Sequence, residues 1–128
     1  PINPSQQTLW GHSYGALFVL YTLFTHPELF SHYIAADPSL WWHNGLMQHY
    51  ANRARIAPNR HLIIQKSGAG IPQKANPTHT SNVPTDAAQQ LAQQLRQRGI
   101  ATEYHSHPQQ THGGLLTQSF QELLDSIQ

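Results

Sequence analysis

Short apolar runs alternate with helix-like segments along this chain of 128 residues, and this alternation is the feature that most limits its possible folds. Runs with strand character are each followed by a segment with helical periodicity or helix boundary signals. We expect strands at 7–10, 32–36, 60–66 and 102–107, and helices at 14–25, 45–55, 85–98 and 115–127. Such an order is typical of an α/β fold in which helices cover both faces of a parallel sheet.

The composition excludes several classes of protein. The chain has no cysteine, so it holds no disulfide framework and no thiolate metal site. Seven basic residues nearly balance six acidic ones, which predicts neither a nucleic-acid partner nor a basic membrane-binding surface. No apolar run approaches the roughly 20 residues that cross a bilayer. The composition does not decide between a cytoplasmic and a periplasmic location.

The segment Gly11-His12-Ser13-Tyr14-Gly15 lies where the first expected strand meets the first expected helix. It fits the pattern G-x-S-x-G, in which a sharp strand-to-helix turn lifts a nucleophilic serine out of the sheet. The same turn would direct the backbone amide of Tyr14 at a developing oxyanion, close to a helix N-terminus. From the pentapeptide alone, a helix-capping role for Ser13 is an equally good interpretation.

His112 is the candidate base for such a serine. A serine hydroxyl is a poor nucleophile until a neighbouring imidazole takes its proton. His112 lies in the segment Gln110-Thr-His-Gly-Gly114, between the last expected strand and the last expected helix. This is the place of the base when the chain order is serine, acid, histidine.

Three segments together resemble the putative-esterase branch of the α/β-hydrolases: GHSYGALF at 11–18, ADPSLWW at 36–42 and HGGLLTQSF at 112–120. This branch contains esterase D-like enzymes and siderophore trilactone esterases of the enterochelin esterase type. The resemblance implies the C-terminal half of an α/β-hydrolase fold and hydrolysis of a carboxylic ester, with a siderophore trilactone among the candidate substrates. It also implies Ser13 as nucleophile, His112 as general base and acid, and the Tyr14 amide as one oxyanion donor. No cofactor is implied.

The third member of a triad is not evident. Members of the resembled family often carry a carboxylate just beyond the third of these strands, aligned with Ser67-Gly-Ala-Gly70, and this chain has none there. We interpret Asp37 as the residue of an Asp-Pro turn, and Asp86 as a residue of the first turn of its helix. We therefore expect a Ser13–His112 dyad without a carboxylate on the second ring nitrogen. If a carboxylate is present there, we expect Asp37.

The histidines suggest an alternative, a metal hydrolase. His105 and His107 are two residues apart on an expected strand and so share one face, a spacing that can bind a metal. A third ligand would come from one of three further histidines: His12, His43 and His49. We rank this alternative below the serine hydrolase because neither an HExxH motif nor paired carboxylates accompany the histidines.

Two tryptophans, Trp41 and Trp42, follow the second expected strand. They line a pocket for an aromatic acyl or catechol group, or they pack the end of a strand, and the sequence favours neither interpretation.

A complete α/β-hydrolase has several strands before the nucleophile strand, and a loop among them supplies the second oxyanion amide. None of those strands is found here, so we interpret residues 1–128 as a single α/β-hydrolase domain that lacks the N-terminal strands. We expect the chain to contact the N-terminal half of the same enzyme, or a second copy, through the exposed edge of the first strand. The competing hypothesis is a catalytically incomplete fragment.

Overall fold

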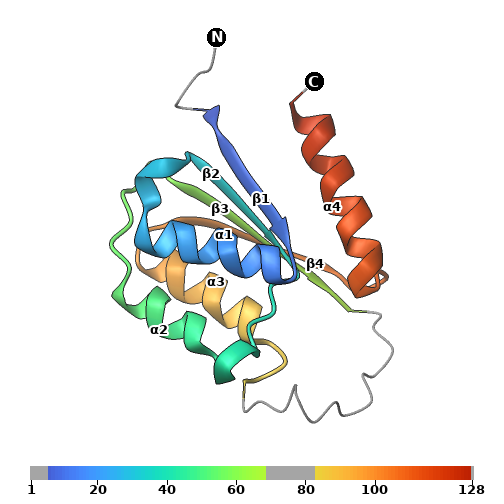
Figure 1. Ribbon diagram of the computed structural model, residues 1–128, viewed down its shortest axis with the longest axis horizontal. Helices are drawn as coiled ribbons and strands as arrows, with labels where there is room; N and C mark the ends of the chain where they lie inside the picture. The colour runs from blue at the N-terminus through green and yellow to red at the C-terminus, as the bar shows by residue number, and fades with distance from the viewer. Residues whose placement is uncertain (1–5, 69–82, 128) are drawn as a thin grey trace.

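A four-stranded parallel sheet organises the computed structural model, which describes residues 6–68 and 83–127 (Figure 1). Its strands follow one another in chain order: β1 (Thr8–His12), β2 (His32–Ala36), β3 (His61–Ser67) and β4 (Ala101–His107). The helices are α1 (Tyr14–Thr25), α2 (Leu46–Arg53), α3 (Ala87–Gln97) and α4 (His112–Ser126), with short 3₁₀ turns η2 (Pro27–Leu29) and η3 (Trp42–Asn44). The expected α/β class and the parallel sheet are confirmed.

Helices cover both faces of this sheet, as expected. Successive side chains of a strand point to opposite faces, and on β3 the buried Ile64 packs into the core formed with α1, α2 and α3. Its neighbour Gln65 points the other way and donates a hydrogen bond to Glu122 on α4, at 3.0 Å. Trp10 on β1 likewise donates to Ser119 on α4, at 2.9 Å. Among the described helices, α4 therefore lies on the face opposite α1, α2 and α3 (Figure 1).

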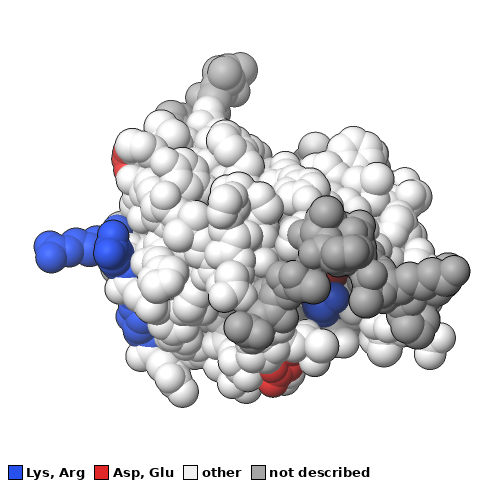
Figure 2. All heavy atoms as spheres, turned by 60° about the horizontal axis from the view of Figure 1, so that its bottom comes forward, with Lys and Arg blue, Asp and Glu red and all other residues white. Residues whose placement is uncertain are grey.

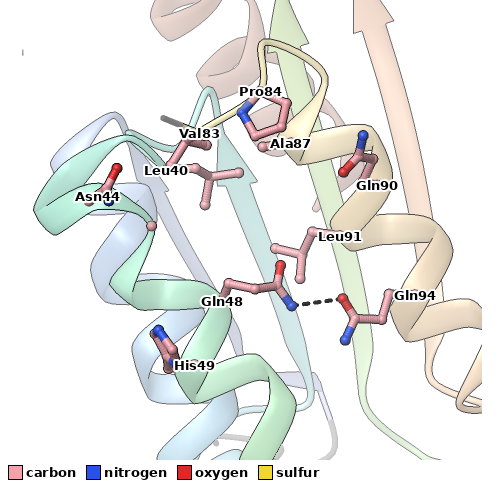
Figure 3. A pocket seen from close by; sticks show the side chains of 11 residues that line it. Leu40, Asn44, Gln48, His49, Val83, Pro84, Ala87, Gln90, Leu91 and Gln94 are labelled. Carbon is pink, nitrogen blue, oxygen red and sulfur yellow. Dashed lines mark hydrogen bonds between the residues drawn. The ribbon is translucent and has the colours of Figure 1, made fainter. Parts of the chain in front are cut away.

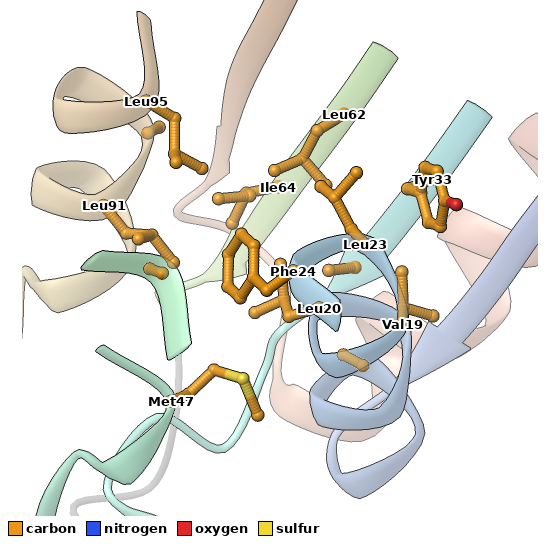
Figure 4. Packing of buried hydrophobic residues seen from close by; sticks show 14 of the residues in the cluster. Val19, Leu20, Leu23, Phe24, Tyr33, Met47, Leu62, Ile64, Leu91 and Leu95 are labelled. Carbon is orange, nitrogen blue, oxygen red and sulfur yellow. The ribbon is translucent and has the colours of Figure 1, made fainter. Parts of the chain in front are cut away.

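The hydrophobic core lies between the sheet and helices α1, α2 and α3 (Figure 4). Helix α1 is apolar on most of its surface, and Val19, Leu20 and Leu23 are fully buried. Residues of α3 and β3 close the core around them, and complete burial of such a side chain stabilises the fold by about 1.5–3 kcal/mol. This packing holds the start of α1, where Ser13 lies, firmly against the end of β1.

Helix α4 begins three residues earlier than the expected 115–127, at His112. Thr111 is its N-cap, and the Thr111 hydroxyl oxygen accepts a hydrogen bond from the backbone N–H of Gly114 at 2.9 Å. This cap offsets the low helix propensity of the two glycines at 113 and 114. His112 is therefore held in the first turn of a helix rather than in a loop.

Few apolar side chains of α4 are fully buried. Leu115 is buried together with Ser119, whereas Leu116 and Phe120 are 42% and 46% exposed. Phe120 packs on Trp10 of β1, with 5.3 Å between the ring centroids. Phe120 therefore stays partly exposed although it contacts the sheet.

The polar segment 67–84, rich in glycine, proline, asparagine and threonine, predicts a long loop. Ser67 instead ends β3, and residues 69–82 lie outside the described residues. Among the helices that the structure describes, none is long and apolar enough to span a membrane. On the face shown in Figure 2, basic and acidic residues are few and scattered.

Candidate active site

Ser13 stands at a strained turn between β1 and α1. Its backbone angles, φ 61° and ψ −116°, lie in a region that residues with a side chain rarely adopt. The Ser13 backbone N–H donates to the carbonyl of Ala36 at 3.0 Å, which fixes the turn against the end of β2. Ser13 occupies the N-cap position of α1, but its side chain makes no capping hydrogen bond. The expected strained turn is confirmed, and helix capping does not explain this serine.

Gly11 permits the turn to close. A Cβ atom at position 11 would lie 2.4 Å from the carbonyl oxygen of Gly15, far inside van der Waals contact. Only glycine therefore allows the end of β1 to approach the first turn of α1 so closely. At Gly15 a Cβ atom would meet no atom within 4 Å, so the two glycines of the pentapeptide are not equivalent.

The Ser13 hydroxyl shares a hydrogen bond with the buried Ser39, 3.1 Å from one side-chain oxygen to the other. The described part of the chain holds no Ser13–His112 hydrogen bond, so the approach of these two side chains stays a prediction. Tyr14 is the first residue of α1, and its backbone N–H therefore has no carbonyl partner within that helix. Its donation to an oxyanion stays a prediction.

Asp37 contacts the ring of His112, which corrects the expected dyad. The carboxylate accepts a hydrogen bond from Nδ1 of His112, although the two residues are 75 positions apart in the chain. Asp37 follows β2 directly, has φ 52° and is only 3% exposed. The expectation that no carboxylate contacts this nitrogen was wrong, as was the interpretation of Asp37 as a turn residue alone. The second choice, that such a carboxylate would be Asp37, is correct.

The end of β3 supplies donors to Asp37. Ser67 donates through its hydroxyl and, at 3.2 Å, through its backbone N–H, while the Lys66 ammonium lies 3.2 Å from the carboxylate. Ser67 lies in the region where family members often carry a carboxylate, so in this chain the acid lies at the end of β2 and its donors at the end of β3. The signal in the sequence was an acid directly after one strand and a Lys-Ser pair at the end of the next.

The environment of Asp37 favours its charged form. Burial alone would raise the pKa of this carboxyl, but the hydrogen bonds from Ser67 and His112 and the charge of Lys66 outweigh it and lower the pKa below its ordinary value. A carboxylate only accepts, so His112 carries its proton on Nδ1. Nε2 of His112 is therefore the nitrogen left to accept a proton.

Asp86 is not part of this site. It is the N-cap residue of α3, one position before the first turn in which we expected it, and its carboxylate accepts from Gln90 at 2.9 Å.

The structure does not support the expected histidine pair as a metal centre. His105 contacts Glu103 at 3.3 Å, and His107 contacts Gln118 at 3.2 Å. Within the described ranges, no third metal ligand gathers around the two. The described residues that do group as ligands are His12, Asp37 and His112, whose ligand atoms lie within 4.8 Å of one another. These belong to the site already built around Ser13.

The two tryptophans are placed differently. Trp41 packs edge-on against Tyr14 with 5.8 Å between ring centroids, and Trp42 lines an apolar groove of about 330 Å³ whose wall includes Tyr14. The groove runs between α1 and α2 and is walled by aromatic and aliphatic side chains: Tyr14, Leu17, Phe18, Tyr21, Trp42, Leu46, Met47 and Tyr50. It offers an apolar surface next to the Ser13 turn.

A second hollow, of about 460 Å³, lies between α2 and α3 (Figure 3). Amide side chains form part of its wall, and Gln48 donates to Gln94 across it at 2.7 Å. Neither Ser13, Asp37 nor His112 lines this hollow, so it is separate from the candidate site.

Comparison with known proteins decides the family. A family model described as "Putative esterase" matches residues 1–128. The chain belongs to this family. It is 44% identical over 76 residues to a siderophore enterobactin esterase of Emericella nidulans, which covers 59% of the chain and 22% of that protein. It is 51% identical over 41 residues to the ferri-bacillibactin esterase BesA of Bacillus subtilis, which covers 32% of the chain and 14% of that protein.

Solved structures of esterases share the fold. The enterobactin hydrolase IroE, in complex with DFP, superimposes with a TM-score of 0.71 at 26% identity, over 95% of this chain and 45% of that protein. The siderophore hydrolase EstA of Aspergillus nidulans gives a TM-score of 0.67 at 26% identity, over 84% of this chain and 43% of that one. The chain thus spans less than a quarter of these curated relatives and less than half of these solved structures.

Proposed function

We propose that this chain carries the catalytic residues of a serine esterase, with Ser13 as nucleophile, His112 as general base and Asp37 as the carboxylate that orients the base. The observation that carries the proposal is the buried Asp37 carboxylate on Nδ1 of His112, at the same end of the sheet as the strained Ser13 turn. Three roles that a triad requires thus have candidates at the ends of three different elements.

In the proposed acylation step, Nε2 of His112 takes the proton of the Ser13 hydroxyl while its oxygen attacks the ester carbonyl. The imidazolium that forms is stabilised by the Asp37 carboxylate on Nδ1. The negative charge on the former carbonyl oxygen is met by the Tyr14 amide at the positive end of α1. Collapse of this intermediate breaks the ester bond, and His112 returns the proton to the departing alcohol.

In the deacylation step, water replaces the alcohol. His112 takes a proton from the water, the hydroxide oxygen attacks the acyl carbon, and the Ser13 oxygen leaves with that proton. The carboxylic acid is then released and the serine is regenerated. No cofactor enters either step.

For the substrate, we propose an ester of the siderophore class. The curated relatives are named as esterases of enterobactin and bacillibactin, which supports this choice. Aromatic side chains, Tyr14 among them, line the groove between α1 and α2. They provide a surface on which an aromatic ring of such an ester can pack.

A fluorophosphonate probe tests the proposed nucleophile. We expect it to label Ser13 in the wild-type chain and to leave Ser13→Ala unlabelled. A matched control is Ser126→Ala, at the far end of α4, which should label as fast as wild type. Labelling that persists in folded Ser13→Ala would show that another residue is the nucleophile.

A second candidate is a catalytically incomplete fragment. The observation behind it is that the chain covers only 43–45% of the solved esterases described above, and the second oxyanion amide of this fold comes from a loop before the nucleophile strand. Comparing labelling of the 128-residue chain with that of a complete family esterase separates the two candidates. If only the latter is labelled, the chain alone is incomplete.

A further inference from the structure

His12 directly precedes Ser13 and contacts the proposed base, and the mechanism above does not use it. Its Nε2 is 2.7 Å from the backbone carbonyl oxygen of His112, which lies 100 positions further along the chain. The two imidazole rings also contact each other, with 4.4 Å between their centroids and 39° between their planes. His12 thus contacts both the backbone and the ring of the proposed base.

The chemistry of this contact fixes the proton on His12. A carbonyl oxygen only accepts, so Nε2 of His12 must donate. The bond ties the last residue of β1 to the first residue of α4. The side chain of His112 is 46% exposed, and among the described residues both Asp37 and His12 contact its ring.

The charge of His12 is compatible with this role. Burial lowers its pKa, and the nearby charge of His112 lowers it further, which outweighs the opposing effects of the His112 carbonyl and Asp37. His12 therefore stays neutral at pH values where an ordinary histidine begins to charge. A neutral ring does not repel the imidazolium that His112 forms during acylation.

We propose that His12 is a positioning residue for the base: its Nε2–H holds the start of α4 so that the His112 ring stays between Asp37 and Ser13. This inference rests on the proposed function, because it assigns His12 a task only if His112 is the base. It gives a role to the residue that precedes the nucleophile, which the pattern G-x-S-x-G leaves unspecified.

Two substitutions separate the hydrogen bond from the ring contact. His12→Phe keeps an aromatic ring and removes the donor, whereas His12→Gln keeps an amide donor near the place of Nε2 and removes the ring. The exposed His49 on α2 supplies the matched control, His49→Phe.

We expect His12→Phe to lower kcat for p-nitrophenyl acetate about 10- to 100-fold, because small displacements of a base are costly, while KM changes little. His12→Gln should recover most of this loss, and His49→Phe should match wild type. Wild-type kcat in His12→Phe, or an equal loss in both His12 variants, would overturn the proposal. If His12→Phe does not fold, as judged by thermal unfolding, His12→Leu takes its place.

A measurement without turnover keeps this test independent of the proposed function. In a Ser13→Ala background, the Nδ1–H proton of His112 should give a low-field NMR signal that is sharp with His12 or Gln at position 12. With Phe at that position it should broaden, because the ring is held less firmly and the proton exchanges faster with water. An unchanged signal in His12→Phe would contradict the positioning role. Activity that survives Ser13→Ala would instead contradict the proposed function.

Discussion

At the scale of single residues, Asp37 is the group on which the proposed chemistry depends most. It holds Nδ1 of His112 protonated, so Asp37→Asn would allow the other tautomer and occupy Nε2 with a proton. We expect kcat to fall by about 10³-fold or more, with KM nearly unchanged. Asp86→Asn, at an exposed helix cap, is the control. Steady-state kinetics of the two variants measure the difference. Wild-type kcat in Asp37→Asn would show that Ser13 and His112 act as a dyad without Asp37.

Asp37 also predicts how stability depends on pH. Its pKa is lowered in the folded protein from an ordinary value of 3.8, so the unfolded chain binds a proton more readily. The stabilisation is therefore fully present above pH 3.8 and is lost as the pH falls through the range below. Denaturant unfolding between pH 2.5 and 7 should show this loss in wild type. Asp37→Asn should lose less over the same range, and equal slopes would contradict the assignment.

Gly11 and Gly15 offer a matched pair for testing the elbow. A Cβ atom at position 11 would collide with the Gly15 carbonyl, so Gly11→Ala should destabilise the fold by about 1–3 kcal/mol and disturb the position of Ser13. Gly15→Ala meets open space within α1 and should be neutral or stabilising by up to about 1 kcal/mol. The free energy of unfolding of each variant checks this. Equal stability of the two variants would show that the elbow is not closely packed.

At the scale of secondary-structure elements, local patterns predicted most of the fold. The bounds of α1 and β2 agree with the expected ones because a buried helix and a buried strand each carry a clear apolar pattern. The start of α4 was missed because two glycines disfavour a helix and the Thr111 cap outweighs them. The Asp37–His112 contact was missed for a different reason. It depends on which strand ends meet in space, and periodicity along the chain carries no information about that.

The groove between α1 and α2 gives a prediction at this scale. Phe18 lines it and is 61% exposed, so Phe18→Ala removes apolar surface from the proposed ring site without opening the core. We expect kcat/KM for p-nitrophenyl phenylacetate to fall about 10-fold, mainly through KM, while the acetate ester is hydrolysed as before. Leu29→Ala, also exposed but outside the groove, is the control. Equal losses on both esters would remove the groove from substrate binding.

At the scale of the whole molecule, β1 combines an unpaired edge with an exposed aromatic contact. Strand β1 pairs with β2, and no other described strand pairs with its second edge. Phe120 of α4 is 46% exposed and packs on Trp10 of this same strand. An unpaired edge flanked by apolar side chains favours pairing with another polypeptide.

We therefore expect the 128-residue chain to associate through this edge, with the N-terminal half of the same enzyme where it is supplied and otherwise with a second copy. Sedimentation should show concentration-dependent association of the chain alone. Phe120→Lys should weaken it because a charge then lies beside Trp10, and Gln121→Lys, which adds the same charge at the neighbouring exposed position, should not. Adding the N-terminal half should raise ester hydrolysis by about 100-fold or more, since it would supply the second oxyanion amide. A chain that stays monomeric and hydrolyses p-nitrophenyl esters as fast as a complete family member would contradict this expectation.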